Sequence, residues 1–279
     1  MFQPGLLQGR RILVTGGGTG LGRAMATRFA GLGARLVLCG RRKAVLEEAA
    51  RAIEAAHGGS VELHDLDLRD AAAVEAMMAH VFEGEGLDVL VNNAAANFIA
   101  RSETLSPRAV DAVLGIVLHG AAYVTLACGR RWIAAERPGT VLSIVTTYAW
   151  TGSAYVVPSA MAKAGVLAMT RSLAVEWGRH GIRLNAVAPG PFPTQGAWER
   201  LVPRADLAEE FERRNALGRV GRHEELADLA AYLMSERSGY ITGDCITIDG
   251  GEWIKGAGQF NFLDRLSAAD WDALKPKKG

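Results

Sequence analysis

A glycine-rich stretch near the N-terminus constrains the fold of this chain more than any other feature. The sequence TGGGTGLG, residues 15–22, directly follows the apolar run RILV and opens a helical pattern that continues to residue 33. Glycines at positions 16, 20 and 22 permit a tight turn and let the backbone approach a pyrophosphate at the helix N-terminus. A strand, such a turn and a helix in this order predict a dinucleotide-binding unit.

Short apolar runs alternate with longer helical patterns almost to the C-terminus. Further strand-like runs occupy about 34–40, 60–67, 87–94, 140–146, 182–190 and 245–251, and helical patterns about 43–59, 70–83, 107–135, 157–178 and 223–235. Strands that are apolar on both faces and joined by crossover helices predict an α/β fold, with a parallel sheet covered by helices on both sides. We predict one domain over residues 1–279, in which the long segment 191–222 forms a substrate lid.

Composition excludes several classes of function. The chain has 279 residues, of which 49% are apolar and 22% charged, and a net charge of +1, so we expect a soluble protein without nucleic-acid or membrane partners. Cys39, Cys128 and Cys245 are scattered without metal-binding spacing, which indicates free thiols, no metal site and a reducing compartment. Neither a cleavable signal nor a run of 18 apolar residues is visible, so we expect a cytoplasmic location.

The end of the second strand indicates the cofactor. In this type of unit an acidic residue there binds the ribose 2′-hydroxyl of NAD, whereas this chain reads CGRRK, with Arg41 and Arg42 in that place. An acid would repel a 2′-phosphate, but a guanidinium binds one in bidentate fashion. We therefore predict NADPH as the cofactor.

Together these motifs resemble the short-chain dehydrogenase/reductase family. The turn is of the type T-G-x-x-x-G-x-G, and NNAA at 92–95, APGP at 188–191 and DGG at 249–251 follow strands as they do in that family. The resemblance implies a single-domain Rossmann fold, a doubly wound seven-stranded parallel sheet with helices on both faces, and a homotetramer. The cofactor contacts that it implies, together with the two arginines, are Gly16, Thr19, Gly20, Leu21, Gly22, Arg41, Arg42, Asp67, Leu68, Asn93, Lys163, Pro189, Gly190 and Thr194.

The chain departs from most of that family at one position. The usual pattern Tyr-x-x-x-Lys places both groups on one helix face, but here Ser159 precedes Lys163 by four residues. A serine hydroxyl is a much weaker acid than a phenol, so it cannot donate the proton in carbonyl reduction. The same departure occurs in 2,4-dienoyl-CoA reductases of the mitochondrial type, which this chain resembles in NNAAANFIARSETLSP, TTYAWTGSAYVVPSAMAKAG and PGPFPTQGAWERL.

That resemblance implies a reaction and four catalytic residues. NADPH would reduce a 2,4-dienoyl-CoA thioester to the 3-enoyl-CoA, a step in the β-oxidation of unsaturated fatty acids. Tyr148 and Asn97 would donate hydrogen bonds to the thioester oxygen, which carries negative charge after hydride transfer. Lys163 would hold the nicotinamide ribose, and Ser159 would act as a hydrogen-bonding spacer. The substrate partner is therefore an acyl-CoA thioester.

Several alternatives remain open at this point. Tyr155, eight residues before the lysine, is a second candidate for the active tyrosine beside Tyr148. His119 occupies a position where many family members have a relay asparagine, and either a relay or a structural role fits it. Thr146 lies where the wider family has its catalytic serine, and it would position substrate or tyrosine. Other reductions, of a 2-enoyl-CoA, a 3-oxoacyl thioester or an enone, also fit, as does a non-catalytic NADP-binding module.

Overall fold

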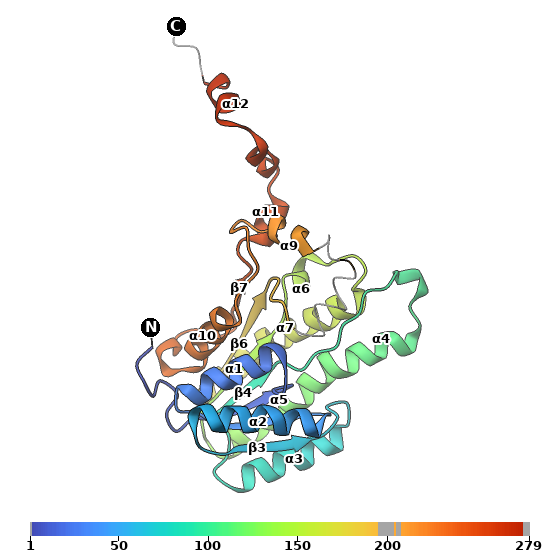
Figure 1. The fold of residues 1–279 in the computed structure, drawn as a ribbon. Coiled ribbons are helices and arrows are strands. Elements are labelled where there is room, and N and C mark those ends of the chain that lie inside the picture. Colours follow the sequence, from blue (N-terminus) through green and yellow to red (C-terminus); the bar gives the residue numbers. More distant parts are fainter. Residues whose placement is uncertain (1, 195–203, 205–207, 276–279) are drawn as a thin grey trace.

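A computed structural model of the chain describes residues 2–194, 204 and 208–275 (Figure 1). Seven parallel strands form one sheet in the order β3-β2-β1-β4-β5-β6-β7. Their bounds are β1 Arg11–Thr15, β2 Arg35–Gly40, β3 Val61–Asp65, β4 Val89–Asn92, β5 Gly139–Ile144, β6 Ile182–Pro189 and β7 Cys245–Ile248. The predicted doubly wound sheet is confirmed, and the order reverses between β1 and β4, where such sheets bind ligands.

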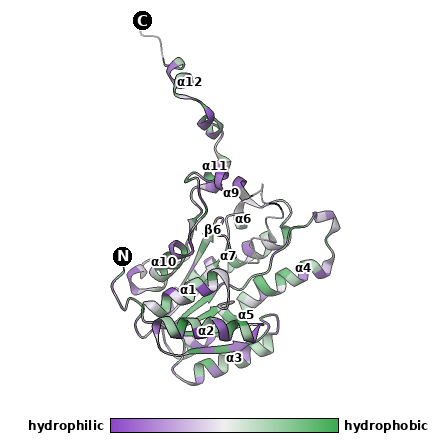
Figure 2. Cartoon of the chain, viewed as in Figure 1, coloured by the Kyte–Doolittle hydropathy of each residue, from purple (hydrophilic) through white to green (hydrophobic). Residues whose placement is uncertain are grey.

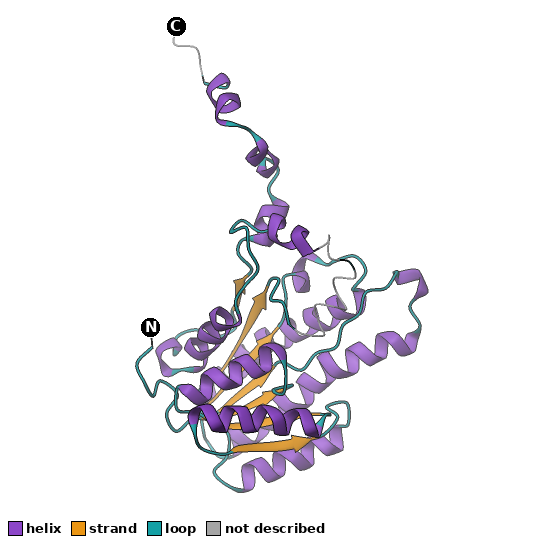
Figure 3. Cartoon of the chain, viewed as in Figure 1, coloured by secondary structure: helices purple, strands orange, loops and turns teal. Residues whose placement is uncertain are grey.

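Helices cover both faces of this sheet (Figure 3). The major ones are α1 Gly20–Gly31, α2 Lys43–His57, α3 Ala71–Glu83, α4 Pro107–Leu114, α5 Gly120–Ala134, α7 Val157–Trp177 and α10 His223–Met234. Side chains alternate along β1, so that Ile12 and Val14 pack with α1, α2 and α10, whereas Leu13 faces α3, α5 and α7. Each face of the sheet therefore has its own buried layer, as the apolar runs predict.

The helix predicted over 107–135 contains a π-helical turn. Residues Gly115–His119 form this turn, η2, between α4 and α5. The run Pro107–Ala134 has the length of a membrane span and contains an 18-residue window with a mean hydropathy of 1.8, but 56% of that window is buried inside the fold. That burial, against the sheet and the neighbouring helices, accounts for its apolar composition.

Four short helices near the carboxyl edge of the sheet or beyond it were not predicted. They are α6 Tyr148–Thr151, α9 Ala208–Arg214, α11 Glu252–Ala257 and α12 Ala268–Ala273. Within the predicted lid 191–222, α9 is described, whereas 195–203 and 205–207 lie outside the described residues. Closure of this segment over substrate stays a prediction.

Candidate active site

The glycine-rich turn adopts backbone conformations that require its glycines. Gly16 and Gly20 have φ angles of +67° and +53°, a region that other residues rarely adopt. Gly22 is needed for a different reason, because a Cβ there would lie 2.4 Å from the Gly16 carbonyl oxygen and 2.5 Å from the Asn93 amide nitrogen. The turn thus brings bare backbone and the N-terminus of α1 to the carboxyl edge of the sheet, which suits a pyrophosphate.

Side chains from β1 and the end of β4 hold this turn in place. The Thr15 hydroxyl accepts hydrogen bonds from the backbone N–H groups of Asn93 and Ala94, both at 3.0 Å. In return, the Asn93 amide donates to the carbonyl oxygen of Thr15 at 3.0 Å. The two strands at the reversal of sheet order are therefore locked together at their carboxyl ends.

A cleft of about 1410 Å³ extends from this turn across the carboxyl edge of the sheet. The cleft is lined by all but one of the predicted cofactor contacts: Gly16, Thr19, Gly20, Leu21, Arg41, Arg42, Asp67, Leu68, Asn93, Lys163, Pro189, Gly190 and Thr194. The exception is Gly22, which packs against the backbone of the turn. The predicted catalytic residues Asn97, Tyr148 and Ser159 line the same cleft. The structure therefore brings both predicted groups of residues into one site that is large enough for a dinucleotide and a second ligand.

Two arginines give one end of the cleft an unpaired positive charge. Arg41 and Arg42 are exposed, and neither guanidinium group makes a hydrogen bond or ion pair with any residue that the structure describes. Asp67 beside them is already engaged, because Arg69 binds its carboxylate at 2.6 Å and lowers its pKa. The guanidinium groups are thus free for a phosphate, and the residues of the cleft fit a dinucleotide that carries one at this end.

Tyr148 lies at the centre of a small hydrogen-bonded group. Its hydroxyl is 3.0 Å from the Ser159 hydroxyl, and the Asn97 amide nitrogen donates to it at 3.4 Å. Burial raises the pKa of Tyr148, against the opposing effect of hydrogen bonds with Ser159 and Thr146. The phenol therefore keeps its proton at neutral pH, so it can serve as a hydrogen-bond donor to a negatively charged oxygen.

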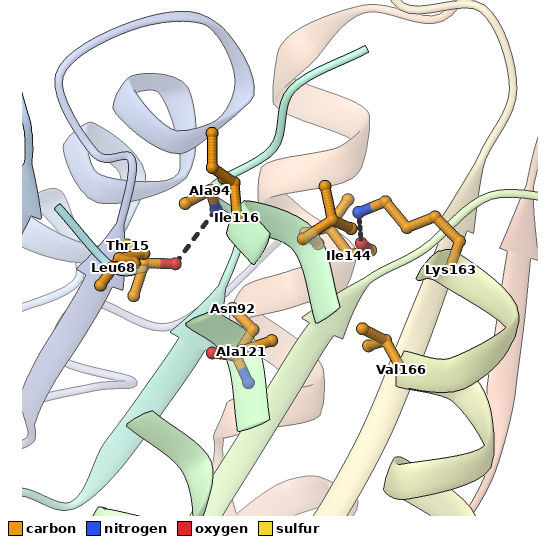
Figure 4. A pocket seen from close by; sticks show the side chains of 10 residues that line it. Thr15, Leu68, Asn92, Ala94, Ile116, Ala121, Ile144, Lys163 and Val166 are labelled. Carbon is orange, nitrogen blue, oxygen red and sulfur yellow. Dashed lines mark hydrogen bonds between the residues drawn. The ribbon is translucent and has the colours of Figure 1, made fainter. Parts of the chain in front are cut away.

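Lys163 lies one helical turn after Ser159 on α7 and is almost fully buried. Its ammonium donates a hydrogen bond to the Ile144 carbonyl at the end of β5, as Figure 4 shows. Desolvation by burial lowers the pKa of Lys163 to about 8, so the group is mainly charged at pH 7. The same side chain faces a cavity of about 10 Å³ that Asn92 and Ile116 also line.

The structure places the alternative residues differently. Tyr155 lines the mouth of the cleft with 59% of its surface exposed, and its φ of +67° is unusual for a residue other than glycine. His119 is exposed and lies against Tyr123, with 6.2 Å between ring centres, and it does not line the described cavities near Lys163. Thr146 does line the cleft. The geometry therefore leaves Tyr148 as the partly buried, hydrogen-bonded tyrosine of the site, and His119 does not line the cleft.

Sequence reasoning missed one wall of the cleft. Phe211 and Arg214 of α9 and Glu252 and Trp253 of α11 line it. Arg214 lies 3.8 Å from the Glu252 carboxylate, whose pKa is raised by burial. The helices that carry these residues are six or seven residues long, and so few residues do not give a recognisable helical period of apolar positions.

Comparisons with known proteins identify relatives along most of the chain. A family profile described as enoyl-(acyl carrier protein) reductase matches residues 16–252. A protein of Caenorhabditis elegans named probable 2,4-dienoyl-CoA reductase 3, (3E)-enoyl-CoA-producing, is 43% identical over 97% of this chain and 90% of its own length. A protein of Bacillus subtilis named probable 2,4-dienoyl-CoA reductase, (2E)-enoyl-CoA-producing, is 43% identical over 89% of this chain and 98% of its own.

A solved structure supports the same relationship. The short-chain dehydrogenase of Bacillus anthracis aligns with a TM-score of 0.80 and 43% identity, covering 88% of this chain and 96% of that one. The profile, the two relatives and the solved structure each match the chain along most of its length. The chain belongs to the short-chain dehydrogenase/reductase family, whose members are oxidoreductases that use NAD or NADP.

Proposed function

We propose that this protein reduces 2,4-dienoyl-CoA thioesters with NADPH and releases 3-enoyl-CoA. The observation that carries the proposal is the position of Tyr148, whose hydroxyl lies between the Asn97 amide at 3.4 Å and the Ser159 hydroxyl at 3.0 Å. Ser159 stands four residues before Lys163, where ketone-reducing members have their tyrosine. The names of relatives at 43% identity support the same substrate class.

The substrate needs two hydrogen-bond donors more than it needs a strong acid. When bound, NADPH supplies a hydride to C5 of the dienoyl group, and the negative charge moves through the conjugated system to the thioester oxygen. Tyr148 and Asn97 form an oxyanion hole for that oxygen. The orientation of Asn97 suits this role, because its Oδ1 accepts a hydrogen bond from the Phe98 backbone at 2.9 Å. Its amide nitrogen therefore points toward the Tyr148 hydroxyl, to which it donates one N–H, and a second N–H remains for the substrate.

The remaining residues of the site hold the reactants. Ser159 fixes the hydroxyl of Tyr148, and Lys163 contributes a positive charge that favours the anionic state of the bound substrate. Arg41 and Arg42 bind the 2′-phosphate that distinguishes NADPH from NADH. With Tyr148 thus fixed as a neutral hydrogen-bond donor, the residues of the site assist the reaction by binding the reactants and by stabilising the negative charge on the thioester oxygen.

The position of the product double bond depends on where the dienolate takes up its proton. Protonation at Cα gives the 3-enoyl product, whereas protonation at Cγ gives the 2-enoyl product. The two relatives at 43% identity carry names that specify different products. We propose Cα, because Tyr148 and Asn97 would hold the enolate oxygen, and Cα is the carbon of the dienolate nearest to that oxygen and carries much of its negative charge.

The decisive experiment is NADPH oxidation with 2,4-hexadienoyl-CoA, run beside NADH and beside acetoacetyl-CoA. We expect NADPH-dependent turnover of the dienoyl thioester, little with the ketone, and a 3-enoyl product by NMR. Preferred reduction of acetoacetyl-CoA would refute the interpretation of Ser159 and Tyr148. Nucleotide binding without turnover of a wider panel that includes 2-enoyl-CoA would favour the non-catalytic module.

A further inference from the structure

Two tryptophan rings join the helix that carries Tyr148 to the wall of the cleft that α11 supplies. Trp150 of α6 and Trp253 of α11 lie edge to face, with ring centres 5.9 Å apart and 85° between the ring planes. This arrangement sets the positive edge of one ring against the negative face of the other, which is a favoured aromatic geometry. Figure 1 shows α11 and α6 beyond the carboxyl ends of the strands, so the contact connects segments that are far apart in the sequence.

Helix α6 depends on tertiary contacts for its position. It is a single turn of four residues, none of which is fully buried, and a helix this short is not stable alone in water. Residues 151–155, at its end and beyond, are all exposed. Its contacts with α7 come from Ala149, which packs against a buried cluster that includes Val166, and from the hydroxyl of Tyr148. Trp150 adds a contact with a different element, α11.

The other ring belongs to a segment that is firmly attached to the end of β7. Asp249, which is buried, accepts hydrogen bonds from the backbone N–H groups of Gly251 and Trp253, both at 2.9 Å. The Lys255 ammonium donates to the carbonyl oxygen of Arg213 at 3.0 Å, which ties α11 to α9. Figure 2 shows that α11 mixes hydrophilic and hydrophobic residues, and none of them is fully buried. These polar contacts therefore hold α11 in place as a support for α6.

Trp150 and Tyr148 belong to the same turn but serve different surfaces. Tyr148 lines the cleft, whereas Trp150 is not among the described residues that line it. Positions two apart on a helix do not face the same side. The turn is closed by the hydrogen bond from the Gly152 N–H to the Tyr148 carbonyl at 3.1 Å, so it moves as a unit. A displacement of Trp150 therefore also displaces the Tyr148 hydroxyl relative to Asn97 and Ser159.

We propose that Trp150 is a positioning residue, which rests on Trp253 and so holds α6 where the Tyr148 hydroxyl reaches the substrate oxygen. This inference rests on the proposed function of Tyr148 as an oxyanion donor. The Tyr148 hydroxyl is 3.4 Å from the Asn97 amide nitrogen, already at the long end of hydrogen-bond distances, so an outward shift of α6 would separate the two donors. A misplacement of about 1 Å in a reacting group is enough to slow a reaction severely.

Steady-state kinetics of Trp150→Leu test whether this ring contributes to turnover. We expect kcat for 2,4-hexadienoyl-CoA to fall about tenfold, the factor that corresponds to the upper end of the interaction energy of an aromatic pair. KM for NADPH should stay unchanged, because Trp150 is not among the described residues that line the cleft. Trp150→Phe keeps an aromatic ring and should recover most of the lost rate. A kcat of Trp150→Leu equal to that of wild type would overturn the proposal.

Trp271→Leu is the matched control for the loss of a tryptophan side chain. Trp271 lies on α12, and it is 48% exposed, close to the 39% of Trp150. It is not among the described residues that line the cleft, so its replacement should leave kcat unchanged. An equal loss of kcat in Trp150→Leu and Trp271→Leu would show that the effect does not come from the contact with Trp253, and would overturn the proposal.

A double-mutant cycle separates positioning from a general disturbance of the fold. In protein that already carries Tyr148→Phe, the addition of Trp150→Leu should change kcat by less than about twofold, because the hydroxyl that Trp150 positions is no longer there. A purely structural role would lower kcat by the same factor in both backgrounds. That second result would overturn the assignment of Trp150 as a positioning residue.

Hydrogen–deuterium exchange of the same proteins gives a result that does not depend on turnover. In Trp150→Leu the amides of a peptide that spans residues 146–152 should exchange faster than in wild type, whereas peptides from α10 should not change. In Trp271→Leu the 146–152 peptide should behave as in wild type. Unchanged exchange of this peptide in Trp150→Leu would overturn the proposal. A wild type that does not reduce the dienoyl thioester would instead refute the proposed function, and the exchange rates would still decide whether the tryptophan contact holds α6.

Discussion

Replacing Lys163 by methionine should remove activity and yet leave the folded chain at least as stable as wild type at neutral pH. Burial lowers the pKa of this lysine from 10.5 to about 8. Each pKa unit corresponds to about 1.4 kcal/mol, so holding the ammonium inside the fold costs about 3 kcal/mol at pH 7. Methionine avoids that cost, but it leaves the Ile144 carbonyl without its partner, which costs ~1–3 kcal/mol.

The difference in unfolding free energy between Lys163→Met and wild type should depend on pH, because only wild type has a lysine that titrates at this position. Between pH 8 and 10.5 the unfolded chain holds a proton that the folded chain has released, so the free energy of unfolding of wild type rises with pH. The methionine variant lacks this gain. Its stability relative to wild type should therefore fall by about 2 kcal/mol between pH 7 and pH 9.5.

Urea denaturation of both proteins without nucleotide, at pH 7 and pH 9.5, measures this change. Lys43→Met is the control for the removal of a lysine side chain, because that lysine is exposed. The reasoning fails if the difference between Lys163→Met and wild type stays constant over this range. It also fails if the variant is less stable than wild type at pH 7, because the relieved cost of about 3 kcal/mol should at least offset the lost hydrogen bond.

Three further predictions concern the cleft. Tyr148→Phe should lower kcat for the dienoyl thioester by ~10²–10³-fold through loss of one oxyanion donor, whereas Tyr155→Phe should retain activity. Equal effects of the two substitutions in steady-state kinetics would contradict the assignment of Tyr148 as the active tyrosine. Arg41→Asp should reverse the preference for NADPH over NADH in kcat/KM, and an unchanged preference would count against the phosphate site. Gly22→Ala should weaken nucleotide binding at least tenfold and lower the free energy of unfolding in urea by ~1–3 kcal/mol, because the new Cβ would lie 2.4 Å from the backbone. Gly84→Ala is the control, because that glycine has open space around it, and it should change neither quantity.

The parts of the structure that the sequence predicts are those with strong local signals. The seven strands and the long helices are recognisable because their apolar residues recur with the period of the element they form. The turn at 15–22 combines glycines with a flanking strand and helix, which locates the cofactor end of the cleft. The convergence of Asn97, Tyr148 and Ser159 was expected from family resemblance, and their hydrogen bonds require the structure.

What the sequence does not predict depends on tertiary context. The π-helical turn Gly115–His119 uses residues that are equally compatible with an ordinary helix, so no local signal marks it. Residues of α9 and α11 reach the cleft because the chain returns to the carboxyl edge after β6 and β7, not because of a motif. The aromatic residues Phe260, Phe262 and Trp271 have the composition of core residues, and only the structure shows that they are exposed.

The strand order also affects when the site can form during synthesis. The dinucleotide turn lies at residues 15–22, but β7, which pairs with β6 beside the cleft, ends at Ile248. A ribosome that adds 5–20 residues per second needs roughly 10–50 seconds to travel that distance. During this interval β1 and β2 can pair while the carboxyl edge of the sheet lacks the wall that α11 supplies. A nascent chain can therefore present the turn to nucleotide well before it can enclose a substrate.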